Sequence, residues 1–275
     1  MAILFLSAIL LVILAIFALD LRLAVRRYEI PAKSLNKPLR IVLLADHHSS
    51  PYGNKQVRLL EEIHATEPDL ILLAGDMVDD KRPYVRTTQL YQGLRNYPVY
   101  YVIGNHECRR TDMAAMKALA ESYGITVLTD ETMTAEINGI PLLFGGIDDL
   151  EKTWHREPTF DHNAVMERVF APVKSAPGYG ILIAHRPELI KTYTRYGFDL
   201  VVSGHAHGGQ VRIPGLLNGL FSPGQGLFPR WAGGVYRHGS TTHVVSRGLS
   251  KTIFPPRIFN RPEIVVIDLV PQIEK

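Results

Sequence analysis

Residues 40–48 read RIVLLADHH, an apolar run that ends in one aspartate and two histidines. A short run rich in Ile, Val and Leu is typical of a strand that is buried on both faces. Similar apolar runs recur at 70–74, 99–103, 180–184 and 200–203. Residues 54–66 and 111–123, in contrast, have the apolar spacing of helices. Strands that alternate with helices along the chain predict an α/β fold.

The C-terminal third has a different pattern. Residues 210–213, 241–246 and 263–269 read as further strands, and a Gly- and Pro-rich stretch, 214–234, separates the first two. A second sheet is therefore expected, and a loop as long as 214–234 is usually functional or disordered. No repeat or Gly/Ser linker divides residues 39–275, which we treat as one domain.

An apolar segment stands at the N-terminus. Residues 2–19 read AILFLSAILLVILAIFAL, with Ser7 as the single polar side chain. About 18 residues at 1.5 Å each cover roughly 27 Å, close to the thickness of a bilayer core. We expect residues 1–21 to form a transmembrane anchor. A signal peptide and a buried core helix stay open as alternatives, although no positive residue precedes the run and Asp20 follows it.

The segment 22–38 is expected to be a basic, extended linker between the anchor and the domain. The cations near it are Arg22, Arg26, Arg27, Lys33, Lys37 and Arg40, against the acidic residues Asp20 and Glu29. By the positive-inside rule, this excess predicts a single-pass protein whose catalytic domain faces the cytoplasm. The whole chain carries a net charge of only +3. The membrane is thus an expected partner, whereas a nucleic acid is not.

Polar residues of metal-binding type follow five of the apolar runs. They are Asp46 and His48, then Asp76, then Asn105 and His106, then His185, and finally His205 and His207. Open α/β sheets place their ligand sites beyond the carboxyl ends of strands, so these side chains are expected at one edge. Five such clusters together predict a metal site, although each alone is more often a turn former or a surface residue.

The types of these side chains narrow the choice of metal. Imidazole, carboxylate and amide oxygen without thiolate suit Mn, Fe, Zn or Co, and manganese is our first choice. The candidates are numerous enough for two divalent ions that share one aspartate, the arrangement of two-metal phosphoryl transfer. The one cysteine, Cys108, excludes an intramolecular disulfide, and we expect it to be a packing residue.

The order of these motifs resembles a known family. Asp46-x-His48, Gly75-Asp76-x-x-Asp79, Gly104-Asn105-His106-Glu107, His185 and Gly204-His205-x-His207 resemble the five-block signature of the calcineurin-like metallophosphoesterases. The resemblance spans Asp46 to His207. Gly208-Gly209-Gln210 and Ser246-Arg247-Gly248 are similar to the bacterial branch of membrane-associated or exported phosphoesterases. The family fold implied is two mixed β-sheets packed as a sandwich and flanked by helices.

The resemblance also implies roles for these residues. It places Asp46, His48 and His207 on one metal ion, and Asn105, His185 and His205 on the other. Asp76 would bridge the two ions. In this family a metal-bound hydroxide attacks phosphorus, His106 would protonate the leaving oxygen as general acid, and Asp79 would orient His106.

The substrate is less well defined by the sequence. Asp79 is followed by Asp80-Lys81 rather than by the Arg-Gly of Ser/Thr protein phosphatases, which disfavours a protein substrate. The loop 214–234 combines apolar residues with arginines, and would suit a membrane-associated phosphodiester or pyrophosphate, such as a lipid-linked nucleotide sugar, if it is exposed. Packing of this loop over the sheet is an equal alternative. Two other functions remain open: a non-catalytic scaffold that binds a partner through this loop, and an exported cell-envelope phosphoesterase.

Overall fold

The apolar runs of the sequence form the middle of two six-stranded mixed sheets. The computed structural model describes residues 1–155, 161–251 and 255–272. The first sheet has the order β1-β14-β2-β3-β4-β5, and β2 to β5 are parallel. Its strands are β1 (Ala24–Ala32), β14 (Glu263–Pro271), β2 (Leu39–Leu44), β3 (Leu70–Ala74), β4 (Val99–Val102) and β5 (Thr126–Val127).

The second sheet has the order β12-β13-β9-β8-β7-β6. Its four middle strands are parallel, and the two edge strands, β12 and β6, are antiparallel to their neighbours. The strands are β12 (Gly234–His238), β13 (Thr241–Val245), β9 (Leu200–Ser203), β8 (Tyr179–Ala184), β7 (Ile140–Ile147) and β6 (Glu131–Ile137).

The two sheets pack face to face around one buried core. Ile41 and Leu72 of the first sheet lie in the same apolar cluster as Phe144 and Ile183 of the second, and all four are fully buried. Each such side chain contributes roughly 1.5–3 kcal/mol to folding. The expected sandwich of two mixed sheets is confirmed.

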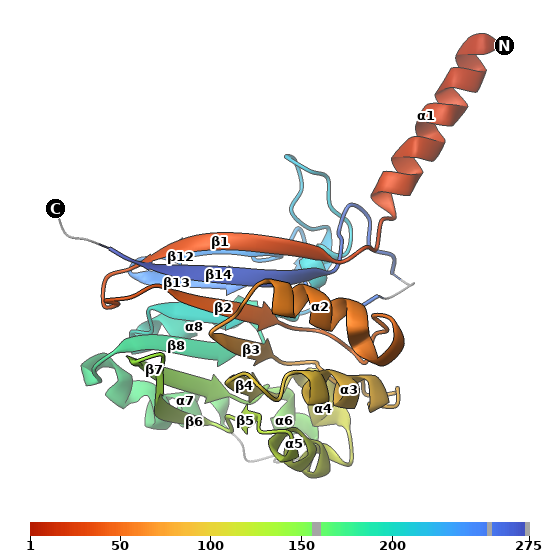
Figure 1. Cartoon of the computed structure of the whole chain (residues 1–275). Helices are drawn as coiled ribbons and strands as arrows, with labels where there is room; N and C mark the ends of the chain where they lie inside the picture. Colours follow the sequence, from red (N-terminus) through yellow and green to blue (C-terminus); the bar gives the residue numbers. More distant parts are fainter. Residues whose placement is uncertain (156–160, 252–254, 273–275) are drawn as a thin grey trace.

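Helices cover the outer faces of the sandwich (Figure 1). Outside the first sheet, apolar residues of α2 (Val57–Ala65), α3 (Val85–Gly93) and α5 (Met113–Ser122) join its buried cluster, and η1 (Asn54–Gln56) precedes α2. Outside the second sheet, α7 (His162–Phe170) and α8 (Ile190–Tyr193) do the same. The remaining short elements are α4 (Asn105–Arg109), α6 (Glu151–His155), η2 (Ala171–Ser175), η3 (Pro187–Leu189), η4 (Thr194–Tyr196) and η5 (His207–Gly209).

Part of the expected linker is a strand. Residues 24–32 form β1, which pairs in parallel with β14 from Ala24 opposite Glu263 to Ala32 opposite Pro271. The backbone is extended, as the sequence predicts. Its hydrogen-bonding groups, however, are satisfied by the C-terminal strand.

The N-terminal helix, α1 (Ala2–Ala18), projects away from the sheets (Figure 1). Its 17 residues cover about 26 Å, less than the roughly 30 Å of a bilayer core. Among the residues that the structure describes, no helix is both long and apolar enough to cross a membrane. The predicted transmembrane helix is therefore not found.

The loop 214–234 divides into exposed and covered residues. A short hairpin of β10 (Phe221–Ser222) and β11 (Gly226–Leu227) stands within it. Leu216, Leu227 and Phe228 are exposed to 82%, 66% and 66%, whereas Trp231 is half-buried. The predicted strand 210–213 makes only isolated bridges, from Val211 to Ile258 and from Ile213 to Leu217.

Candidate metal centre

The strand ends bring the predicted ligands together at one edge of the sandwich. Asp46 and His48 follow β2, Asp76 follows β3, and Asn105 begins the helix after β4. These come from the first sheet. His185 follows β8 and His205 and His207 follow β9, so the second sheet supplies three imidazoles.

The backbone at this edge is unusual. Asp46, His48, Asp76, His205 and His207 all have positive φ, between 46° and 63°. Such conformations cost about 1–3 kcal/mol each in residues other than glycine and cluster at functional sites. The chain therefore holds five of the predicted ligands in backbone conformations that are unfavourable for residues other than glycine.

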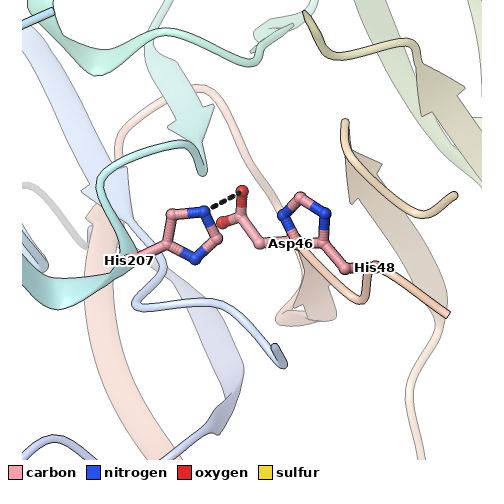
Figure 2. A group of neighbouring side chains, drawn as sticks. All are labelled: Asp46, His48 and His207. Atoms are coloured by element: carbon pink, nitrogen blue, oxygen red, sulfur yellow. Dashed lines mark ion pairs between the residues drawn. The ribbon is translucent and has the colours of Figure 1, made fainter. Parts of the chain in front are cut away.

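Three groups of side chains have the geometry of metal sites; one consists of His48, Asp79 and His106, and the other two consist of predicted metal ligands. In the first of these two, one ligand atom each of Asp46, His48 and His207 lie within 4.8 Å of one another, and Figure 2 shows these side chains converging. His207 Nε2 and Asp46 Oδ1 are 3.8 Å apart.

The second group consists of Asp76, His185 and His205, again within 4.8 Å. Asn105 joins it, because its Oδ1 lies 3.1 Å from His185 Nε2. Asp76 Oδ2 lies 3.3 Å from His185 Nε2 and 3.6 Å from His48 Nε2, and therefore stands between the two groups. That is the position the sequence predicts for a bridging ligand; which residues bind metal stays a prediction.

The second group also shows that a cation fits here. His185 Nδ1 lies 2.8 Å from the Ala74 carbonyl, which can only accept, so the ring proton is on Nδ1. The Nε2 lone pair of a neutral His185 then faces oxygens of Asp76 and Asn105, and these acceptors need a positive charge between them. Although burial lowers it, the Asp76 carboxylate raises the pKa of His185 to about 10.

The other imidazoles are held in the neutral form, which is the form that binds metals. Burial lowers the pKa of His48 and His205 well below the ordinary value and that of His207 to about 3. Neutral imidazole is the metal-binding species. His48 Nε2, His205 Nε2 and His207 Nδ1 are buried and have no hydrogen-bond partner among the described residues. Unpartnered buried nitrogens of this kind fit a divalent ion that the fold family implies.

The predicted general acid lies beside both groups. His106 Nε2 is 4.0 Å from Asp76 Oδ2, and the backbone N–H of His106 donates to Asp76 Oδ1 over 2.8 Å. Its Nδ1 donates to Asp80 Oδ1 over 3.0 Å. The sequence predicts Asp79 as the residue that orients His106. Asp79 Oδ2 lies 3.7 Å from His48 Nδ1.

Glu107 organises the loops that carry these residues. Its Oε1 accepts hydrogen bonds from Val78 N–H and the Tyr101 hydroxyl, both over 2.8 Å. Its Oε2 accepts from Asp76 N–H over 3.0 Å and from Gly104 N–H over 2.9 Å. Burial, and then the charge of Asp76, raise the pKa of Glu107 to about 7. One carboxylate thus joins the turns after β3 and β4.

The sequence did not assign several residues around the site. In the sequence, Asp80 only marks a difference from the protein phosphatases, and Glu107 is only a member of its motif. Neither residue has a role predicted from the sequence. A cavity of about 270 Å³ opens on the centre, and residues without a predicted role also line it. Its lining residues are Asp76, Asn105, His106, Arg109, Glu151, Arg186, His205, His207, Pro223 and Gly224. No motif surrounds the two arginines, so spacing gave no signal for them.

Residues 39–209 match the family model described as calcineurin-like phosphoesterase. The chain belongs to this family. It is therefore a metal-dependent phosphoester hydrolase with a divalent metal site. An uncharacterized metallophosphoesterase of Bacillus subtilis is 29% identical over 237 residues, which are 84% of this chain and 78% of that protein.

A further relative in sequence and one similar solved structure differ more from this chain in length or sequence. A Danio rerio transmembrane protein with metallophosphoesterase domain is 30% identical over 254 residues, 88% of this chain but 56% of that protein. The structure of the NAD nucleotidase of Haemophilus influenzae superposes with a TM-score of 0.52 at 17% identity, over 80% of this chain and 46% of that one. The latter likeness concerns the fold alone.

Proposed function

We propose that this phosphoesterase uses two divalent ions, with manganese as the first choice, to hydrolyse a phosphodiester or pyrophosphate in a membrane-associated metabolite. A lipid-linked nucleotide sugar is one such substrate. The observation that carries the proposal is the cavity of about 270 Å³, because metal-centre residues and the loop residues Pro223 and Gly224 line it together. A phosphoryl group in this cavity therefore lies next to the loop that bears exposed apolar side chains.

The two groups of ligands support two ions rather than one. Asp46, His48 and His207 form one group, and Asp76 lies between it and the group around His185. When bound, such ions supply an activated water and neutralise phosphoryl charge. The protein's own part is to hold the ligands before substrate arrives, through the Glu107 hydrogen bonds and the buried His185.

His106 is proposed to give a proton to the leaving oxygen. Its side chain is 24% exposed at the cavity, and the hydrogen bond from Nδ1 to Asp80 leaves Nε2 as the atom that can face substrate. A carboxylate that accepts a hydrogen bond from Nδ1 fixes the orientation of the ring. Asp80 is thus proposed to position His106, and Asp79 to act through His48.

The test compares substrates with good and poor leaving groups on manganese-loaded protein. Bis-p-nitrophenyl phosphate releases a phenolate that needs little protonation, whereas diphenyl phosphate, which lacks the nitro groups, releases a more basic phenolate. His106→Ala should lower kcat for the poor leaving group by roughly 10²–10⁴-fold, and for the good one much less. Asp80→Asn should follow the same pattern more weakly. An equal loss on both substrates would exclude the proton-donor role, and no activity in the parent protein would exclude the proposed reaction.

The association with lipid rests on two apolar surfaces that are joined to each other. α1 exposes apolar side chains, including Leu10 at 66% and Phe17 at 63%. Phe259 N–H donates to the carbonyl of Ala18, and Arg212 N–H donates to the carbonyl of Ile258, so the ends of α1 and of the loop meet at 258–259. Both project on the same side of the sheets (Figure 1).

Exposed apolar residues flanked by cations favour the surface of an anionic bilayer. We propose that this face lies on lipid and that the catalytic domain is on the cytoplasmic side. The purified chain should co-sediment with vesicles that contain phosphatidylglycerol, and Leu10→Arg should release it. A reporter fused after Lys275 that is active only outside the cytoplasm would refute the orientation. Failure of the parent chain to bind vesicles would refute the lipid contact.

A further inference from the structure

A network of arginines and carboxylates extends from the metal centre along the wall of the cavity. Arg109 is the last residue of α4, one helical turn after Asn105. It forms a bidentate pair with Glu151 of α6, with 2.7 Å from Nε to Oε2 and 2.7 Å from Nη2 to Oε1. Glu151 also accepts from Arg186 Nη2 over 3.2 Å, and Arg186 follows the predicted ligand His185.

The two arginines differ in how many of their guanidinium nitrogens are already used by carboxylates of the described residues. Arg186 is 10% exposed and is used by three carboxylates: Asp149 on Nε at 2.7 Å, Glu151 on Nη2 at 3.2 Å and Glu188 on Nη1 at 3.4 Å. Arg109 is 36% exposed, and Glu151 occupies only its Nε and Nη2. Its Nη1 has no hydrogen bond among the described residues. Arg109 is therefore the cation of this wall that can still take a ligand.

The pairing with Glu151 also prepares Arg109 for binding. A guanidinium held by two hydrogen bonds has already lost much of its side-chain freedom, so less entropy is lost when a ligand arrives. Arg186 in turn holds Glu151, which is 7% exposed. Along α4, Asn105 and Arg109 are separated by about 6 Å, within the extent of one substrate that has two adjacent phosphoryl groups.

We propose that Arg109 binds a second phosphoryl group of the substrate, which makes this protein selective for pyrophosphate esters over substrates with one phosphoryl group. This inference rests on the proposed function and specifies its substrate class. Guanidinium donors match phosphate oxygens in charge and geometry. The first phosphoryl group occupies the part of the cavity lined by Asp76, Asn105 and His106, and the second lies at Arg109.

The reaction then has a defined leaving group. The oxygen of water bonds to the phosphorus beside the metal ligands, and the bridging P–O bond breaks. The departing phosphate monoester takes the proton that His106 holds and leaves from Arg109. The proton that water loses is returned through solvent to His106. Two phosphate monoesters are the products, and no oxidant or further reactant is consumed.

The experiment compares Arg109→Met with a matched control, Arg40→Met. Arg40 also forms an ion pair through its Nε, 2.6 Å from Asp268, and is 34% exposed, but lies at the opposite end of β2 from the metal centre. UDP-glucose provides two phosphoryl groups and bis-p-nitrophenyl phosphate provides one. Arg109→Met should lower kcat/KM for UDP-glucose about 10- to 100-fold more than for bis-p-nitrophenyl phosphate. Arg40→Met should leave the ratio of the two values unchanged.

A second readout does not require turnover of the pyrophosphate. UDP-glucose should inhibit hydrolysis of bis-p-nitrophenyl phosphate competitively, and Arg109→Met should raise its inhibition constant at least tenfold, with partial recovery in Arg109→Lys. Equal losses on both substrates, or an unchanged inhibition constant, would overturn the inference while the phosphoesterase function stands. A parent protein that hydrolyses neither substrate with manganese would instead refute the function beneath it. Urea unfolding of each variant checks that the fold is intact.

Discussion

Replacing Glu107 by glutamine should destabilise the protein far more than its small change in size suggests. Each carboxylate oxygen of Glu107 accepts two hydrogen bonds, four in all. Glutamine keeps one oxygen and presents an amide donor where the other stood. Two donors, for instance the N–H groups of Asp76 and Gly104, then lose their acceptor inside the protein. A hydrogen bond to a charged group contributes about 1.5–3 kcal/mol, so the loss should be roughly 3–6 kcal/mol.

The assay is urea unfolding at pH 8.5, where a Glu107 carboxyl whose pKa is about 7 is ionised. The matched variant is Tyr101→Phe, which removes one donor from the same carboxylate and leaves the other three. It removes one hydrogen bond to a charged group and should therefore cost about 1.5–3 kcal/mol, half of the loss expected for Glu107→Gln. If Glu107→Gln costs no more than Tyr101→Phe, the view that Glu107 holds the two turns together is refuted.

Three further predictions concern titration, metal and backbone. Burial lowers the pKa of His243 to about 3 in the folded protein, so the stability that this neutral side chain contributes is fully present above pH 6.5 and is lost as the pH falls below that value. Between pH 6 and 4, His243→Gln should reduce the slope of the unfolding free energy against pH by about 1.4 kcal/mol per pH unit. Equal slopes in the parent protein and the variant would contradict this. Removing metal with EDTA should lower the thermal midpoint by roughly 8–16 °C relative to protein in which the free metal stands at a thousand times its Kd, and adding manganese should restore the midpoint. An unchanged midpoint would argue against a metal site that exists only in the native state. Gly248→Ala should weaken metal binding, because its φ is 75° and a new Cβ would lie 2.6 Å from Asp46 Cβ. Gly124→Ala is its control, with a φ of 80° and no atom within 4 Å, and equal metal affinities would show that crowding at Asp46 is unimportant.

The sequence predicted the meeting of the ligands for one physical reason, whereas the sandwich was implied by the family resemblance. Parallel strands bring their carboxyl ends to the same edge, so Asp46, Asp76 and His185 could be placed together without coordinates. Their backbone angles could not be predicted. Positive φ at Asp46 and Asp76 depends on the turns that surround them, and the turn at Asp76 is held by Glu107.

The direction of the side chains within a turn could not be predicted from the sequence either. Asp79 and Asp80 are neighbours, and spacing alone cannot determine which one faces His106. In the structure the hydrogen bond is made by Asp80, whereas Asp79 accepts from the backbone N–H groups of Lys81 and Arg82. Short-range turn formation competes here with the long-range contact.

The N-terminal region shows a similar limit. The composition of residues 24–32 is polar enough to read as a linker, because alternate residues of β1 face outward. Its partner, β14, is more than 200 residues away in the chain, and such pairing leaves no local signal. The apolar run 2–19 is helical over the 17 residues of α1, and no helix among the described residues is both long and apolar enough to cross a membrane.

The position of β14 between β1 and β2 has a consequence for how the protein is made. During synthesis, β1 and β2 leave the ribosome more than 200 residues before β14, the strand that separates them. The first sheet therefore cannot be completed until the C-terminal residues are free, and early nascent chains carry two strand edges without their native partner. Because the first sheet supplies Asp46, Asp76 and Asn105, a competent metal centre is expected only after β14 has emerged from the ribosome. Chaperone dependence during expression and low activity of C-terminally truncated chains would follow from this late closure.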